Sequence, residues 1–140
     1  MKELLKQYPT IITKTVEWGD MDAAQHINNT VYFRYFESAR IEFFNQIGFM
    51  DFTGESSVGP ILAETSCKYK APLTFPDTIQ ITARILPDSF TEYGFTMQHV
   101  VYSEKLQRIA AEGTSRIVCY DYKSKQKALI SSELRQKLIT

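Results

Sequence analysis

The chain has 140 residues, of which 44% are hydrophobic and 13% aromatic, which is enough to form the core of a single domain over residues 1–140. The 16 Lys and Arg residues balance the 16 Asp and Glu residues. No basic block is present, which argues against a nucleic-acid-binding surface. No apolar segment approaches the ~20 residues that span a bilayer, and the first residues contain no apolar signal segment, so we expect a cytoplasmic protein that does not enter the membrane.

The first element in the chain should be a strand. Residues 10–18 are rich in β-branched side chains, which favour extended structure. The polar residues 19–25 that follow indicate a loop. This loop leads directly into the most strongly periodic segment of the chain.

That segment should be a long amphipathic helix that ends near Ile47. Asn28 and Asn29 are both good N-cap residues, and Gly48 is a natural helix stop. Apolar residues recur at steps of three and four along one face, as in a helix that packs on a core. These residues are Tyr32, Phe36, Ala39, Phe43 and Ile47, with Val31 and Tyr35 widening the stripe.

After a loop at residues 50–59, the pattern predicts four more strands and a short final helix. The strands are expected at residues 60–69, 78–86, 93–102 and 108–121. The helix is expected at residues 133–138, with Ser131 or Ser132 as its cap. Tight connections join the later strands, so these should be antiparallel. One five-stranded sheet with one large helix is an α+β architecture.

The cysteines and one histidine are better explained by packing than by chemistry. Cys67 and Cys119 lie in apolar, strand-like sequence, where free buried thiols are more common than a disulfide. No Cys-x-x-Cys motif or His/Cys cluster is present, so the sequence predicts no metal site. His99 shares its strand face with apolar residues and is expected to be a hydrogen-bonded core residue.

The loop between the first strand and the helix holds the most polar cluster in the chain. Within residues 20–29 lie Asp20, Asp22, His26, Asn28 and Asn29. The order strand, cluster, helix places a carboxylate beside a helix N-terminus, whose first backbone N–H groups have no partner within the helix. A carboxylate facing a carbonyl held by such N–H groups is what hydrolysis of an acyl compound requires.

The same segment resembles the 4-hydroxybenzoyl-CoA thioesterase-like family of hotdog-fold acyl-thioesterases. The residues that carry the resemblance are Trp18, Gly19, Asp20, Asp22, His26, Asn28, Asn29, Tyr32, Glu37, Ala39 and Arg40. The segment is also similar to the D-x-D-x-x-Q-H-x-N-N stretch of plant acyl-carrier-protein thioesterases. Residues 69–79 are similar to the family's second landmark, a proline loop that ends in an aspartate before a strand. The resemblance implies a hotdog fold, in which a curved five-stranded antiparallel sheet wraps one long central helix.

The resemblance also implies an acyl-CoA thioesterase that releases a free carboxylic acid and a thiol without a metal or redox cofactor. The carrier would be CoA or acyl-carrier protein. Hotdog thioesterases are at least dimers with active sites at the subunit interface, so we expect a homodimer or a homotetramer. Two other interpretations stay open: a hotdog dehydratase, which the Asp-x-Asp motif argues against, and a module that binds acyl thioesters without turnover.

By this resemblance, Asp22 is the catalytic carboxylate, acting either as nucleophile or as general base for a water. The backbone N–H of Asn29 would hold the thioester oxygen, and His26 would assist or orient Asp22. The alternative for Asp22 is a loop residue in an Asx-turn. Asp20 is expected to turn away to loop hydrogen bonds, because two ionised carboxylates at positions i and i+2 repel each other.

Further residues are expected to contact the substrate. Asn28 would cap the helix or make a second polar contact, and Tyr32 would line an apolar acyl pocket. Glu64 and Thr65, on the strand after the long loop, would position a water. The connection at residues 87–93 is basic in some relatives but acidic here. The nearest substitutes for binding the CoA phosphates are Lys68, Lys70 and Arg84.

Overall fold

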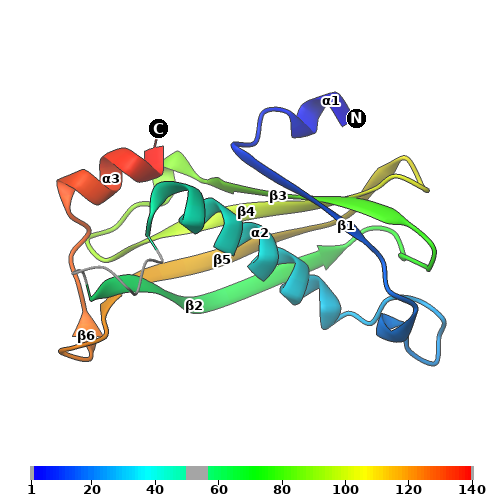
Figure 1. The fold of residues 1–140 in the computed structure, drawn as a ribbon, viewed down its shortest axis with the longest axis horizontal. Helices are drawn as coiled ribbons and strands as arrows, with labels where there is room; N and C mark the ends of the chain where they lie inside the picture. Colours follow the sequence, from blue (N-terminus) through cyan, green and yellow to red (C-terminus); the bar gives the residue numbers. More distant parts are fainter. Residues whose placement is uncertain (1, 50–56, 140) are drawn as a thin grey trace.

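The computed structural model describes residues 2–49 and 57–139, which form a sheet and a long helix lying across one of its faces (Figure 1). The elements in chain order are α1 (Lys2–Leu5), β1 (Thr10–Thr15), η1 (Trp18–Asp20), α2 (Val31–Ile47), β2 (Val58–Tyr69), β3 (Thr78–Ile85), η2 (Pro87–Ser89), β4 (Gly94–Ser103), β5 (Arg108–Asp121), β6 (Gln126–Lys127) and α3 (Ser132–Ile139). None of the described helices is long and apolar enough to cross a membrane.

The sheet is antiparallel, with the strand order β1-β3-β4-β5-β2, and the two-residue strand β6 pairs with β5. It curls around α2, which confirms the predicted α+β hotdog architecture (Figure 1). The short elements α1 and β6 were not expected, because a few residues carry no readable periodicity. Most of the predicted loop at residues 50–59 lies outside the described residues.

The first strand is shorter than its β-branched composition predicts. It ends at Thr15 rather than at residue 18. The N–H of Val16 still donates to the carbonyl oxygen of Asp77, at 2.9 Å, but residues 18–20 then form a 3₁₀ turn. The ladder with β3 runs from Thr10 opposite Ala83 to Thr15 opposite Thr78, so the strand stops where its partner begins.

The start of α2 differs by one or two residues from the prediction. Its N-cap is Thr30, not Asn28 or Asn29. Asn28 instead fixes the turn before the helix: its Oδ1 accepts from the Thr30 N–H at 2.9 Å, and its carbonyl oxygen accepts from the Val31 N–H at 3.0 Å. The other end agrees with the prediction, because Gly48 ends the helix in the left-handed conformation, with φ of 76°.

The helix packs closely on β5 because one position there has no side chain. The ring of Phe36 lies against the backbone of Gly113, where a Cβ would collide with that ring and lie 2.6 Å from the carbonyl oxygen of Ser66. On its other side, the Phe36 ring stacks on His99, with ring centroids 5.0 Å apart. The buried core around this contact is largely aromatic and includes Tyr32, Tyr35, Phe43, Phe44 and Phe95.

A buried polar network lies under the helix. His99 is fully buried, and its Nδ1 and Nε2 lie 3.1 Å from the carbonyl oxygen of Thr82 and 2.8 Å from Oγ of Ser115. Arg40 donates to the same Ser115 oxygen at 3.0 Å. Both ring nitrogens of His99 therefore have partners, which confirms the prediction of a hydrogen-bonded core histidine.

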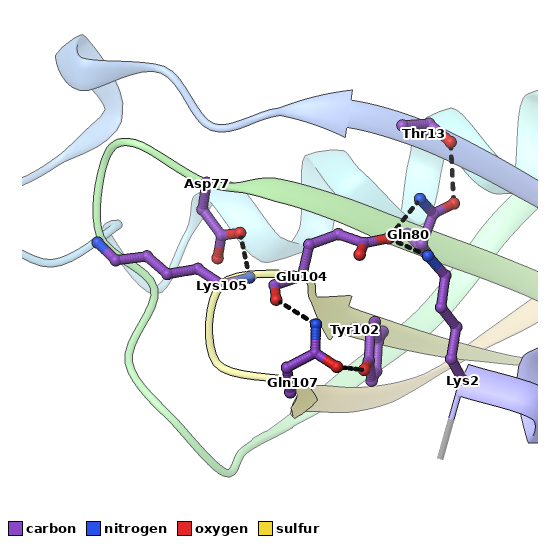
Figure 2. Close-up of polar contacts among 8 residues, drawn as sticks. All are labelled: Lys2, Thr13, Asp77, Gln80, Tyr102, Glu104, Lys105 and Gln107. Atoms are coloured by element: carbon purple, nitrogen blue, oxygen red, sulfur yellow. Dashed lines mark hydrogen bonds and ion pairs between the residues drawn. The ribbon is translucent and has the colours of Figure 1, made fainter.

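The N-terminal helix α1 covers the sheet on the face opposite α2. Leu5 is buried in a separate cluster with Val100 and Tyr102, whose side chains alternate with those that face α2. Lys2 pairs with Glu104, with Nζ and Oε1 2.6 Å apart. Figure 2 shows this pair at the end of a polar row that crosses the sheet edge through Gln80 and Thr13.

The aspartate of the second sequence landmark has a structural task. The Asp77 carboxylate accepts a hydrogen bond from the hydroxyl of Ser103 and another from the backbone N–H of Lys105, at 3.0 Å (Figure 2). The Lys105 ammonium group in turn donates to Oγ1 of Thr74 at 3.1 Å. These bonds tie the proline loop, residues 70–77, to the turn between β4 and β5.

Candidate active site

The polar cluster lies on a tight turn between η1 and α2. The N–H of Asp22 donates to the carbonyl oxygen of His26 at 3.0 Å, and the N–H of Gln25 donates to the carbonyl oxygen of Asp22 at 2.9 Å. Gln25 takes the left-handed conformation that closes the turn, with φ of 63°. Met21 and Ile27 form an isolated bridge at its base. The turn therefore presents Asp22 and His26 side by side at the surface.

The Asp22 carboxylate is exposed but held in one orientation. Its Oδ1 accepts from the N–H of Ala24 at 2.9 Å, and its Oδ2 accepts from Nδ2 of Asn28 at 3.3 Å. Asp22 therefore does form the Asx-type turn that was its alternative interpretation. Each carboxylate oxygen has a second lone pair, so these bonds fix the group without using up its capacity.

Asp20 differs from the expectation. Its carboxylate is half-buried and makes no hydrogen bond within residues 2–49 and 57–139. Its backbone carbonyl oxygen accepts from the N–H of Asn28 at 3.0 Å. The side-chain hydrogen bonds that order the loop come from Asp22, because only that carboxylate lies within reach of the turn's own N–H groups.

Asn29 lies one residue before the N-cap of α2. Its backbone N–H has no acceptor among the described residues, whereas its carbonyl oxygen accepts from the hydroxyl of Tyr69 at 2.8 Å. This N–H lies just outside the 17-residue helix, close to the partial positive charge of the helix N-terminus. Such a donor is suited to an oxygen that gains negative charge.

These groups line one open pocket of about 400 Å³ between the turn and the end of β2. Asp22, His26, Asn29 and Tyr32 contribute from the predicted cluster and helix. Tyr69 contributes from the end of β2 and Lys70 from the start of the proline loop; the sequence analysis assigned Tyr69 no role. The signal that points to Tyr69 is its place at the start of the proline-loop landmark.

A sequence model of the thioesterase-like superfamily matches residues 16–138. The chain belongs to this superfamily. It is 22% identical to the long-chain acyl-CoA thioesterase FadM of Escherichia coli strain K12 over 118 residues, an alignment that covers 84% of this chain and 88% of FadM. Thioesterases of this kind hydrolyse thioesters, and this chain is a thioester hydrolase.

Two solved structures have the same hotdog fold. The PA5185 protein of Pseudomonas aeruginosa strain PAO1 is 27% identical, with a TM-score of 0.81 over 96% of this chain and 92% of that protein. A thioesterase of Thermus thermophilus, solved in complex with coenzyme A and Zn, is 23% identical, with a TM-score of 0.80 over 95% of this chain and 99% of that protein.

Two tyrosines in the pocket of this thioesterase are donors rather than bases. Burial raises the pKa of Tyr32 to about 12, and burial also raises the pKa of Tyr69. Both hydroxyls therefore stay protonated at neutral pH. Their rings meet edge to face, with centroids 5.0 Å apart, and close one wall of the pocket.

The other two residues expected near the substrate lie elsewhere. Glu64 and Thr65 are in the middle of β2 and do not line the pocket. Thr65 donates to the carbonyl oxygen of Thr114 at 3.0 Å, and Glu64 lies opposite Arg116 in the sheet register and is exposed. At about 3.3 Å per residue, Thr65 lies about 13 Å along the strand from Tyr69.

Proposed function

We propose that this thioesterase hydrolyses acyl-CoA to a free carboxylic acid and CoA, with Asp22 as nucleophile or general base. The observation that carries this proposal is that Asp22 lines the same open pocket as Asn29, whose backbone N–H has no acceptor among the described residues. The carboxylate attacks the carbonyl carbon or activates a water that does so, and the N–H stabilises the carbonyl oxygen. FadM, which is similar in sequence, acts on long-chain acyl-CoA by its name.

In this mechanism, the thioester oxygen accepts a hydrogen bond from the Asn29 N–H. Asp22 either attacks the carbonyl carbon, giving a mixed anhydride and the CoA thiolate, or removes a proton from an attacking water. Water cleaves the anhydride in the first case. The ring of His26 lines the same pocket and makes no hydrogen bond within the described residues, so it is free to give a proton to the leaving thiolate.

CoA is the carrier that the chemistry of the pocket favours. Lys70 lies at its wall with an exposed ammonium group, 3.5 Å from Oε2 of Glu112. An exposed ion pair of this kind is weak and can exchange partners with a phosphate. The Thermus thermophilus thioesterase with the same fold was solved with coenzyme A bound, which supports the same carrier here.

The test is thiol release from short, medium, long and aromatic acyl-CoAs by the wild type and by Asp22→Asn. The swap keeps the size of the side chain and removes its charge, so we expect kcat to fall by about 10²-fold or more. Asp88→Asn, a carboxylate swap in the distant turn η2, is the matched control and should keep wild-type turnover.

A second variant separates the backbone of Asn29 from its side chain. Asn29→Ala retains the N–H, so its kcat should stay within a few-fold of the wild type. A loss as large as that of Asp22→Asn would assign the role to the amide side chain instead. Full turnover by Asp22→Asn would refute Asp22 as the catalytic carboxylate. Binding of acyl-CoA without any turnover in the wild type would favour a binding module.

A further inference from the structure

Asp22 lies between two pockets, of which only one has a role so far. On its other side is a second open pocket of about 550 Å³. Its walls are Trp18, Met21 and Phe75, with Gln25 and Thr74 at the margin. Asp22 is the one acidic residue that lines both pockets. The two pockets therefore meet at the proposed catalytic carboxylate.

The apolar walls of the second pocket are exposed in spite of their size. Trp18 is 71% exposed, the most of any large hydrophobic side chain among the described residues, and Phe75 is 46% exposed. Burial of such rings is the usual source of stability, so rings left in water beside a reactive group suggest a ligand that covers them. Trp18 is also the only tryptophan in the chain.

Hydrogen bonds hold the backbone on both sides of this cleft. Trp18 starts the 3₁₀ turn η1, and its carbonyl oxygen accepts from the N–H of Met21 at 3.2 Å. Phe75 lies on the proline loop, whose neighbouring residues Thr74 and Asp77 are tied to Lys105 (Figure 2 shows the Asp77 bond). Because the backbone is already held, binding an acyl chain needs to order only the side chains of the cleft.

The two pockets differ in the chemistry that they offer. The first pocket includes Lys70, whose ammonium group suits the phosphates of a carrier arm. No Lys, Arg or His is among the described residues that line the second pocket, where the exposed rings of Trp18 and Phe75 offer apolar contact to an acyl chain. The carbonyl carbon of a thioester carries the acyl chain and the sulfur in addition to the oxygen. When this carbon lies beside Asp22, the acyl chain and the sulfur point in different directions.

We propose that the cleft between Trp18 and Phe75 binds the acyl group of the thioester, while the pocket at Tyr69 and Lys70 receives the carrier arm. This inference rests on the proposed function and adds to it the residues that set acyl specificity. The substrate class is then an acyl thioester whose chain is long or flat enough to cover both rings.

The first experiment measures acyl preference and carrier preference separately. Substrates are the acetyl and dodecanoyl thioesters of CoA and of N-acetylcysteamine, which has the thiol end of the arm without its phosphates. One buried methylene contributes about fourfold in binding. We therefore expect Trp18→Ala and Phe75→Ala to lower the dodecanoyl-to-acetyl ratio of kcat/KM by tenfold or more, equally with both carriers.

Two further variants complete this experiment. Lys70→Gln should lower the CoA-to-N-acetylcysteamine ratio of kcat/KM several-fold and leave the chain-length ratio unaltered. Leu129→Ala removes an apolar side chain that is 63% exposed at a different pocket, and it should change neither ratio. The proposal would be overturned if Trp18→Ala left the dodecanoyl-to-acetyl ratio unchanged. It would also be overturned if Trp18→Ala changed the CoA-to-N-acetylcysteamine ratio instead.

The second experiment needs no turnover, because Trp18 is itself the reporter. In the Asp22→Asn protein, dodecanoyl-CoA should move the tryptophan emission to shorter wavelength, and CoA alone should not. An equal shift with CoA alone would place the carrier in the cleft and overturn the proposal. Calorimetric binding of dodecanoyl-CoA without any shift would also overturn it, while leaving the proposed function intact. Absence of both binding and wild-type turnover would refute the proposed function itself.

Discussion

At the scale of single residues, buried His99 makes the stability of this fold depend on pH. Burial, together with the nearby charge of Arg40, lowers the pKa of its ring from 6.5 to about 4, although the carbonyl oxygen of Thr82 favours the charged form. In the unfolded chain the ring titrates near 6.5. The neutral ring therefore stabilises the fold fully above pH 6.5, and this contribution is lost as the pH falls toward 4.

Between pH 7 and pH 4, protonation of His99 should lower the free energy of unfolding by about 3 kcal/mol. Urea denaturation at the two pH values measures this difference. His99→Gln has no ring to titrate, so the difference in stability between it and the wild type should narrow by about that amount at pH 4. Parallel curves for the wild type and His99→Gln would contradict this account.

The sequence predicts only those site residues that are near one another along the chain. Asp22, His26 and Asn29 lie within eight positions, so a turn of any ordinary kind brings them together. Tyr69 reaches the pocket because β2 ends beside the start of α2, and that contact depends on the sheet topology. The exposure of Trp18 also depends on the tertiary structure, because no pattern along the chain tells whether its ring is covered.

At the scale of elements, the contact between α2 and β5 depends on the absence of a side chain at Gly113. A Cβ there would meet the Phe36 ring and the backbone of Ser66, which cannot move away cheaply. We expect Gly113→Ala to lower the free energy of unfolding by about 1–3 kcal/mol in urea denaturation. Gly19→Ala is the matched control, because nothing lies within 4 Å of a Cβ at that position.

Backbone entropy alone would stabilise both glycine variants, because Ala restricts the unfolded chain more than Gly does. A loss of equal size in both variants would therefore contradict the helix contact as its cause. Adding Phe36→Leu to Gly113→Ala should recover part of the loss, since a smaller side chain leaves room for the new methyl group. The two changes are then not additive, as expected for groups in contact.

The same scale shows which parts of the fold the pattern specified. The alternation of Ile79, Ile81, Ala83 and Ile85 predicts β3 with one buried face, and the first three side chains are fully buried while Ile85 is half-buried. Thr82, on the opposite face, is also fully buried, which the alternation does not predict. The predicted start of α2 was wrong because Asn28 is a typical N-cap residue. In the structure, Asn28 lies two residues before the N-cap Thr30 and accepts a hydrogen bond from the Thr30 N–H. Periodicity therefore located the elements, whereas local hydrogen bonds decided where they begin.

At the scale of the whole molecule, β2 leaves one side of the sheet open. It pairs with β5 along one edge, and no other strand in the described residues pairs with its second edge. Ile61 and Leu62 are 40% and 44% exposed on this strand. A long apolar edge strand is a template for pairing with another chain. We therefore expect two copies to pair along β2, in the homodimer or homotetramer that the hotdog resemblance implies.

This assembly is tested by light scattering on a size-exclusion column, where the wild type should have two or four times the mass of one chain. Leu62→Lys places a charge on the edge and should shift the mass toward the monomer, whereas Leu129→Lys, at a more exposed site outside β2, should not. Glu64 and Thr65 lie on the same strand and do not line the pocket of their own chain, so we expect them to approach a pocket from a second copy. Thioesterase activity should then fall together with the dimer fraction, and a fully active Leu62→Lys monomer would show that one chain forms a complete site.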